Sequence, residues 1–395
     1  MKKKIAIISN VSWNLYNFRL SLMIAMRDNG YEVVAIAPYD RYSQKIIDEG
    51  FEFHDIKMNA QGTNFIEDMK TTYNFYKLFK EISPDIICQY TIKPNIYGSF
   101  AAALLNIKTI NNIAGLGTLF IKETFVTKVA KSLYKASQHS AEKVFFQNRE
   151  DYNFFTTQGI INKNKCDILP GSGVDTIRFS PKEKSPSERV RFLFIARMIW
   201  EKGIAEYVEA ARIIKKKHEN VEFCMLGFLE VENPGAVTKH EMNEWVDEGI
   251  INYLGISDKV CEVIHTADCV VLPSYYREGT PKTLLESGSS GKPLITTDSI
   301  GCRDVVDDGV NGYLCKPRSS QDLANKLEMF LNLSDNEKSD MGDASRRKMK
   351  DEFDEKLVIE KYLGALNEIV SKETISKSKI VHSYANRLIK RVSLI

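Results

Sequence analysis

Glu278 and Glu286 are the residues of this chain whose type and spacing most suggest chemistry. They flank a turn between an apolar run, Cys269–Leu272, which predicts a buried parallel strand, and a predicted helix over Pro281–Ser289. The turn therefore lies at a strand's carboxyl end, where the unpaired N–H groups and the dipole of the next helix favour an anion. Glu286, two helical turns along, faces the same side. Two carboxylates beside an anion site suit hydrogen bonds to sugar hydroxyls.

A second turn contributes two cations. The run over residues 192–203 (F-L-F-I-A-R-M-I-W-E-K-G) predicts a strand, a turn with Arg197 and Lys202, and a helix that begins near Gly203. Arginine can fork onto two oxygens and lysine supplies a point charge, so the pair suits a diphosphate. Alone, the two glutamates would be a solvated turn and an exposed helix position. Together with the two cations they predict a site for a sugar nucleotide.

Composition excludes several classes of protein. A chain of 395 residues is too long for one ordinary core and predicts two domains, and its net charge of +2 gives no general case for nucleic acid. Its seven cysteines form no C-x-x-C pair, which is typical of a reducing cytoplasm. No compact D-x-D or His/Cys ligand set is present, so no metal and no other cofactor are predicted. No apolar stretch approaches the length that spans a bilayer.

Strand-like and helix-like runs alternate from end to end, which predicts mostly parallel sheets. A polar segment, Ser180–Arg189, interrupts the pattern as a linker. The predicted fold is α/β, with two Rossmann-like, doubly wound domains that face each other across a cleft, over residues 1–178 and 190–371. Helices are predicted at Phe18–Asn29 and, near the end, at Ser334–Lys350 and Glu355–Val370, and a helix over 372–395 is expected to pack back on the first domain. The predicted strands are Ile5–Ser9, Glu32–Ala37, Phe51–Ile56, Asp85–Gln89, Thr109–Ile113, Lys143–Gln147, Cys166–Leu169, Arg191–Ile195, Val221–Leu226, Ile251–Leu254, Cys269–Leu272, Leu294–Thr297 and Gly312–Cys315.

Several ordered motifs resemble those of the family-4 retaining glycosyltransferases of GT-B fold. They are Ala196-Arg197, Glu201-Lys202-Gly203, Ala267-Asp268, Leu272-Pro273-Ser274, Glu278-Gly279-Thr280-Pro281 with Glu286, and Gly309-Val-Asn-Gly312. The resemblance implies that Arg197 and Lys202 hold the donor diphosphate, that Glu286 binds the ribose, and that Glu278 contacts the transferred sugar. Arg197, Lys202 and Glu278 are thus the predicted catalytic residues. The backbone of Gly279, Thr280, Pro281, Lys282 and Thr283 would cradle phosphate and sugar.

Two segments of the first half resemble a narrower branch. Residues 90–98 (Y-T-I-K-P-N-I-Y-G) and 111–117 (N-N-I-A-G-L-G) look like those of bacterial transferases that add N-acetylhexosamines and related sugars to lipid-diphosphate-linked glycans. The acceptor-side residues implied by this resemblance are Asn10, Trp13, Lys93, Asn95, Gly115 and Gly117.

The chain departs from the family pattern in two places. Many members have a double glycine after the first strand, whereas this chain has S-N-V-S-W-N over residues 9–14, so the backbone of Ser12–Asn14 or the Asn14 amide would have to contact the donor instead. Many also have histidines after the fourth strand, where this chain has Cys88 and Tyr90. No histidine is therefore expected to act as a general base.

The expected function is transfer of a hexose or N-acetylhexosamine, with retention of configuration, from a nucleotide sugar, UDP-linked, to a lipid-linked oligosaccharide in surface-polysaccharide synthesis (O-antigen, capsule or similar). Leaving-group stabilisation by fixed cations and a helix N-terminus would supply most of the catalysis. Two alternatives stay open: a nucleotide-sugar 2-epimerase of the same fold, and a non-catalytic subunit of a transferase complex.

Two basic segments raise the question of an anionic membrane surface as a partner. Residues 125–135 place Phe125, Val129 and Leu133 on one stripe beside lysines, and the tail from Lys372 onward interleaves basic and aliphatic residues. Such patterns suit an anionic leaflet, at about 1 kcal/mol per nearby basic residue. The alternative for each is a solvated helix face or a frayed terminus. The expected location is the cytoplasm, at the cytoplasmic face of the inner membrane.

Overall fold

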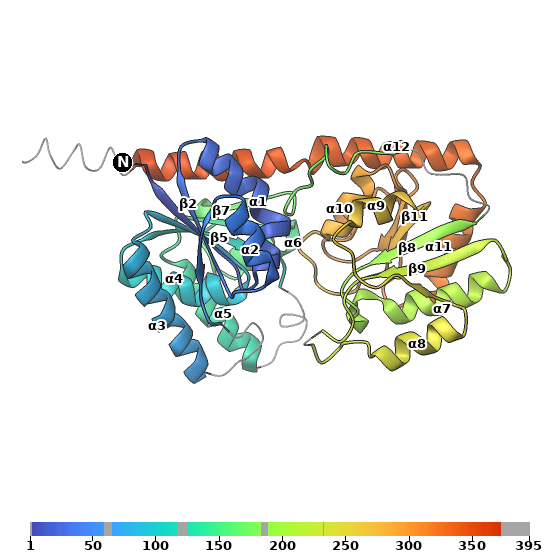
Figure 1. Ribbon diagram of the computed structural model, residues 1–395, viewed down its shortest axis with the longest axis horizontal. Coiled ribbons are helices and arrows are strands. Elements are labelled where there is room, and N and C mark those ends of the chain that lie inside the picture. The colour runs from blue at the N-terminus through green and yellow to red at the C-terminus, as the bar shows by residue number, and fades with distance from the viewer. Residues whose placement is uncertain (1, 59–64, 117–124, 183–188, 232, 373–395) are drawn as a thin grey trace, which may run out of the picture.

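The protein folds into two α/β domains, each built on one parallel sheet with helices on both faces (Figure 1). The computed structural model describes residues 2–58, 65–116, 125–182, 189–231 and 233–372. Within that part of the chain, no helix is both long enough and apolar enough to cross a membrane.

The N-terminal sheet has seven parallel strands in the order β3-β2-β1-β4-β5-β6-β7. The apolar runs of its central strands are buried on both sides, as parallel sheets require. The strands are β1 Lys4–Ile8, β2 Glu32–Ala37, β3 Glu52–Asp55, β4 Ile86–Tyr90, β5 Lys108–Ile113, β6 Lys143–Phe146 and β7 Cys166–Ile168.

Helices connect these strands and cover both faces of the sheet (Figure 1). α1 begins six residues before the predicted Phe18, so Trp13 and Asn14 lie in its first turn and not in a loop. Apolar side chains such as Leu15 and Leu22 bury one stripe of this helix. The helices are α1 Ser12–Asp28, α2 Arg41–Asp48, α3 Phe65–Ile82, a π-helical turn Pro94–Gly98, α4 Ser99–Leu104, α5 Phe125–Gln138 and α6 Arg149–Thr157.

The C-terminal sheet has six parallel strands in the order β10-β9-β8-β11-β12-β13. Its strands are β8 Val190–Ile195, β9 Val221–Leu226, β10 Asn252–Tyr253, β11 Cys269–Leu272, β12 Leu294–Thr297 and β13 Gly312–Cys315. Its α-helices are α7 Ile204–Lys215, α8 Lys239–Asp247, α9 Val260–His265, α10 Lys282–Ser289, α11 Ser320–Leu331 and α12 Asp335–Glu352. Capping boxes at Thr238 and Ser334 begin α8 and α12, because each side chain satisfies helix N–H groups that lack an intrahelical partner.

The strand order reverses once in each sheet. In the first sheet the reversal lies between β1 and β4, and in the second between β8 and β11. At such a point the two following connections leave to opposite faces and open a crevice at the carboxyl ends of the strands. The loops after these four strands contain most of the predicted site residues, so the topology gathers them at the two reversal points.

The chain passes between the domains twice, at neighbouring places. Val174, in the segment that leaves the first domain, forms a parallel bridge with Asp354, where the chain returns. The Val174 N–H donates to the Phe353 carbonyl over 2.9 Å, and the Glu355 N–H donates to the Val174 carbonyl over 3.0 Å. These bonds fasten the two crossings to each other.

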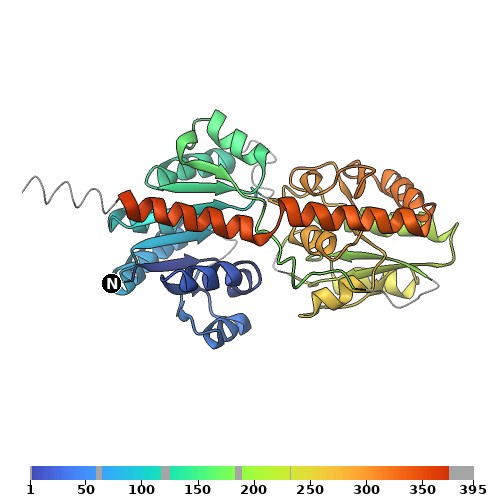
Figure 2. The same ribbon diagram turned by 90° about the horizontal axis from the view of Figure 1, so that it is seen from above.

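The last described helix packs on the first domain although it follows the second in sequence. α12 contacts α10 of the C-terminal domain, and after Asp354 a helix over residues 355–372 continues in line along the N-terminal domain (Figure 2). Its side chains Val358, Tyr362, Leu366 and Ile369 belong to the core that includes β1, β4 and α1. The sequence predicted that the second domain ends at residue 371. The helix over 355–372 instead packs its apolar face on the first domain, because the chain returns to that domain near Asp354. The predicted packing of 372–395 falls, apart from Lys372, outside the described residues.

Leu366→Ala is expected to destabilise the protein by about 2–5 kcal/mol, because it leaves a cavity in the N-terminal core. Chemical denaturation monitored by circular dichroism would measure the loss. Glu368→Ala, on the exposed side of the same helix, is the control and should change stability little. An unchanged unfolding midpoint for Leu366→Ala would contradict the packing of this helix.

Candidate active site

The two turns predicted to hold the site lie next to each other, because β8 and β11 are neighbours in the sheet. The Glu201 carbonyl accepts hydrogen bonds from the N–H groups of Tyr275 and Tyr276, each at 3.0 Å. Gly203 makes the approach possible: it has φ +82°, and a Cβ there would lie 2.1 Å from the Pro273 carbonyl oxygen. The cationic turn is thus fixed against the turn that contains Glu278.

Lys202 and Glu278 form an ion pair at this contact. The Lys202 ammonium contacts Glu278 Oε1, and the two side chains are only 13% and 12% exposed. The Ser274 hydroxyl also donates to Glu278 Oε1 over 3.1 Å, and the Lys202 Nζ lies 5.3 Å from the Tyr276 ring centroid. In the ligand-free protein, each charge therefore satisfies the other.

Arg197 extends the cationic side of the site. It is exposed, and the structure describes no hydrogen bond or ion pair for its guanidinium. Burial raises the pKa of the neighbouring Tyr276, Glu278 adds to the rise, and Arg197 opposes it. Arg197 follows β8 in the same connection as Lys202, and its exposed guanidinium can meet an anion.

Glu286 lies on α10 and is desolvated. Burial raises the pKa of its carboxyl group, and the nearby cations Lys282 and Arg178 oppose the rise. No hydrogen bond is described for its carboxylate oxygens. Glu286 is partly buried, and its carboxylate can accept hydrogen bonds from hydroxyl groups of a ligand.

The N-terminus of α10 is open toward this region. Pro281 occupies the N-cap position and its side chain cannot accept a hydrogen bond, so no side chain caps the helix. The sequence placed Pro281 one position later, at the first helical residue. Lys282 donates to the Gly173 carbonyl over 2.8 Å, and Thr283 is half-buried in the first turn. The helix start can thus still interact with an anion.

Residues from both domains meet around Gly279. A Cβ on Gly115, which has φ +108°, would lie 2.6 Å from the Gly279 nitrogen, and a Cβ on Gly279 would lie 2.5 Å from the Ala114 carbonyl oxygen. The Thr280 hydroxyl donates to the Gln147 carbonyl over 2.9 Å. Gly115, predicted for the acceptor side, therefore lies against the Glu278 turn. Gly117 is outside the described residues.

Asn10, Trp13 and Asn14 lie after β1, at the reversal point of the first sheet. Asn10 is half-buried, and Trp13 packs edge-on against Phe18 with 4.9 Å between ring centroids. The Asn14 side-chain oxygen is buried without a hydrogen-bond partner. Asn14 therefore lies after β1, where the donor contact was predicted, but its oxygen is enclosed by protein atoms.

Lys93 and Asn95, after β4, make contacts within their own domain. The Lys93 ammonium lies 2.9 Å from Asp68 Oδ1, and the Tyr97 hydroxyl donates to Asp68 Oδ2 over 2.7 Å. Asn95 donates to the Asn112 carbonyl over 2.7 Å, while its own side-chain oxygen is buried and unpaired. Lys93 is thus held by a buried carboxylate, whereas the Asn95 oxygen resembles that of Asn14 in lacking a donor.

Sequence reasoning missed three polar residues near the site. Arg19, within the predicted helix over Phe18–Asn29, is buried with its Cζ atom 4.1 Å from the Tyr90 ring centroid. Arg277 and Asp151 form an ion pair between the domains at 2.7 Å. Their 126-residue separation leaves no local pattern that could reveal the pair.

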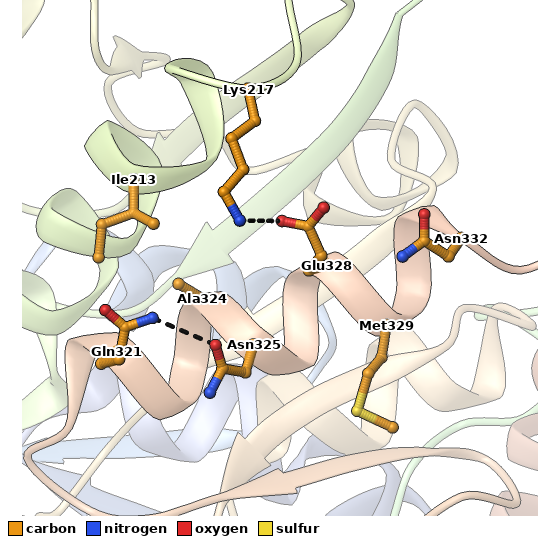
Figure 3. A pocket seen from close by; sticks show the side chains of 8 residues that line it. All are labelled: Ile213, Lys217, Gln321, Ala324, Asn325, Glu328, Met329 and Asn332. Atoms are coloured by element: carbon orange, nitrogen blue, oxygen red, sulfur yellow. Dashed lines mark hydrogen bonds and ion pairs between the residues drawn. The ribbon is translucent and has the colours of Figure 1, made fainter.

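One surface pocket lies elsewhere, between α7 and α11 (Figure 3). Lys217 reaches Glu328 across it at 3.1 Å, and Gln321 donates to Asn325 over 3.2 Å. No residue of the turns after β8 or β11 is among its lining residues, which are Ile213, Lys217, Gln321, Ala324, Asn325, Glu328, Met329 and Asn332. Its residues are therefore suited to control variants.

Comparisons with known proteins agree with the division into two halves. Residues 4–148 match the family model "Glycosyl transferase 4-like", and residues 175–348 match "Glycosyl transferases group 1". With this fold and these two matches, the chain belongs to the glycosyltransferases of GT-B fold.

Among its relatives is the N,N'-diacetylbacillosaminyl-diphospho-undecaprenol alpha-1,3-N-acetylgalactosaminyltransferase of Campylobacter jejuni, 27% identical over 93% of this chain and 99% of the relative. Another is the UDP-Gal:alpha-D-GlcNAc-diphosphoundecaprenol alpha-1,3-galactosyltransferase of Escherichia coli, 25% identical over 69% of this chain and 71% of the relative. Among solved structures, Anabaena HepE in complex with UDP superposes with a TM-score of 0.73 at 16% identity, covering 93% of this chain and 100% of that one. This last likeness supports the fold.

Glu286→Gln is expected to stabilise the ligand-free protein at neutral pH and to weaken binding of UDP. The raised pKa means that the favourable protonated state is lost as the pH rises above it, so the ionised carboxylate costs stability at neutral pH. At about pH 8 the variant should unfold at a higher temperature than wild type. The difference between the two unfolding temperatures should become smaller as the pH falls to about 5.

UDP should bind the variant about tenfold or more weakly, because a hydrogen bond to a charged acceptor is lost. Calorimetric titration would measure this, with Glu328→Gln in the outer pocket as the control. Equal UDP affinity in Glu286→Gln and wild type would remove Glu286 from the nucleotide site.

Proposed function

We propose that this glycosyltransferase moves a hexose or N-acetylhexosamine from a UDP-sugar to a glycan carried on a lipid diphosphate, in the synthesis of a surface polysaccharide. The observation that supports it best is the contact at the ends of β8 and β11, where Lys202 pairs with Glu278 and an uncapped helix, α10, follows the Glu278 turn. The two relatives named above act on undecaprenol-diphosphate-linked glycans, and HepE was crystallised with UDP.

Donor binding would exchange partners within the site. Lys202 pairs with Glu278 in the free protein, and a diphosphate placed between Lys202, Arg197 and the α10 N-terminus would attract the ammonium. Glu278 would then accept hydrogen bonds from hydroxyls of the transferred sugar, while Glu286 accepts those of the ribose. The free-state pair thus keeps both charges near their working positions without a ligand.

Catalysis would follow from stabilisation of the leaving group. As the bond between the sugar carbon and the phosphate oxygen lengthens, negative charge grows on the diphosphate, which Arg197, Lys202 and the helix N-terminus stabilise. The acceptor hydroxyl attacks from the same face, its oxygen forms the new bond, and its proton passes to the departing phosphate oxygen. This route retains the configuration and requires neither a histidine base nor a metal ion.

Lys202→Ala or Glu278→Ala is expected to lower kcat/KM for transfer by about 10²–10³-fold while the protein stays folded. The loss of a charge that acts on the transition state accounts for this size. A radiolabelled transfer assay measures it, and Lys217→Ala, which removes an exposed lysine from the same domain, is the matched control. Near-wild-type transfer by either site variant would refute the assignment.

The two alternative functions have separate tests. A 2-epimerase would interconvert a UDP-sugar in the absence of any acceptor, and none of the relatives named above is an epimerase. A non-catalytic subunit would give no product when purified protein is incubated with donor and lipid-linked acceptor. Formation of a product with the retained anomeric configuration in that incubation, and no conversion without acceptor, is the outcome that the proposal expects.

We also propose that the protein works at an anionic membrane surface, at the cytoplasmic face of the inner membrane, because the acceptor of this reaction is lipid-linked. The basic and aliphatic tail after Lys372 is the proposed contact. Flotation with vesicles containing anionic lipid should recover the full chain and less of a chain that ends at Lys372. Equal recovery of the two, or none of either, would overturn the role of the tail.

A further inference from the structure

The backbone of Glu278 is held by a residue of the other domain. The Asn148 side chain donates from Nδ2 to the Glu278 carbonyl oxygen over 3.0 Å. The same side chain caps α6, since its oxygen accepts from the Asp151 N–H over 2.7 Å. Asn148 is buried, so water does not compete with either bond. The start of α6 thus contacts the donor-side turn directly.

The residue that precedes Glu278, Arg277, is held by an ion pair across the same junction. Arg277 Nε donates to Asp151 Oδ1 over 2.8 Å, and its Nη2 lies 2.7 Å from the same oxygen. Asp151 Oδ2 accepts from Asn148 Nδ2 over 3.1 Å. The Asp151 side chain is fully buried and that of Arg277 is 15% exposed. A pair so enclosed is specific, because either charge would be left without a partner if the other moved.

The rest of the turn has little freedom to move. The contacts of Gly279 with Ala114 and of Thr280 with Gln147 fix the residues that follow Glu278. On its other side, the Glu278 carboxylate meets Lys202 and Ser274 of its own domain. Glu278 is therefore held at its backbone by the N-terminal domain and at its carboxylate by the C-terminal domain.

We propose that Asp151 and Asn148 of the N-terminal domain are positioning residues for Glu278, so that the donor site is complete only while the two domains are in contact. This inference rests on the proposed function. A displacement of about 1 Å in a group that orients the reacting sugar can cost about 10²-fold in rate. Separation of the domains would release the Glu278 turn, and contact between them would restore it. Catalysis is thereby coupled to the arrangement of the acceptor-side domain.

Asp151→Asn is the first test, because it removes the charge that holds Arg277 with almost no change in shape. We expect kcat for transfer to fall by about 10²-fold, whereas the Kd for UDP should stay within about threefold, because UDP lacks the sugar that Glu278 contacts. Glu150→Gln is the matched control, because it removes a carboxylate from the same turn of α6. The Glu150 carboxylate lies 3.7 Å from Arg303 and is partly exposed to solvent. Its kcat should equal that of wild type.

Asn148→Ser is the second test and covers the case in which Asp151→Asn fails to fold. Serine can still cap α6, since its hydroxyl accepts the same N–H, but it lacks the amide that reaches Glu278. We expect a folded protein with a small loss of thermal stability, and a fall in kcat of about tenfold, the effect of one hydrogen bond.

The outcomes separate this inference from the function on which it rests. If folded Asp151→Asn and Asn148→Ser keep wild-type kcat, or if they lose UDP affinity as much as kcat, the positioning role is wrong while the transferase assignment stands. If wild type itself transfers no sugar but binds UDP, the proposed function is wrong. A selective loss of kcat in both variants, with Glu150→Gln unaffected, supports the inference.

Discussion

The structure depends on one contact, between the turns that follow β8 and β11. These strands are adjacent at the point where the sheet order reverses, and Gly203 lets the first turn approach the backbone of Pro273. The Lys202–Glu278 pair is the chemical result of that contact. It holds the cationic and the anionic side of the donor site in direct contact. Little water reaches the two side chains, so the attraction between their charges is weakly screened.

The second constraint is the junction between the domains. A glycosyltransferase must exclude water from its donor, since water is a competing acceptor. Here the Glu278 turn is in contact with the first domain through Asn148, Gln147 and the close approach of Gly115 to Gly279. The two chain crossings at Val174 and Asp354 are bonded to each other, and the helix over 355–372 packs on the far domain. The junction between the domains is thus part of the donor site as well as the link between the domains.

Unsatisfied polar groups show where a ligand is expected. Arg197 has no described partner, Glu286 is desolvated, and the side-chain oxygens of Asn14 and Asn95 are buried without donors. Lys93 and Lys282, by contrast, already have partners in Asp68 and the Gly173 carbonyl. Buried polar groups are normally satisfied, so the unpaired oxygens of Asn14 and Asn95 stand out among the predicted site residues.

The sequence by itself determined the local features. Apolar runs and turn residues located the strands to within a residue or two, as at Val221–Leu226, and placed Arg197, Lys202, Glu278 and Glu286 at strand ends and a helix start. These features repeat over a few residues, so a linear pattern reveals them. Only the tertiary structure decided which strands are neighbours, that the last described helix packs on the first domain, and that Asp151 meets Arg277. Such contacts join residues far apart in the chain, and they depend on packing free energy summed over both domains, which no local pattern records.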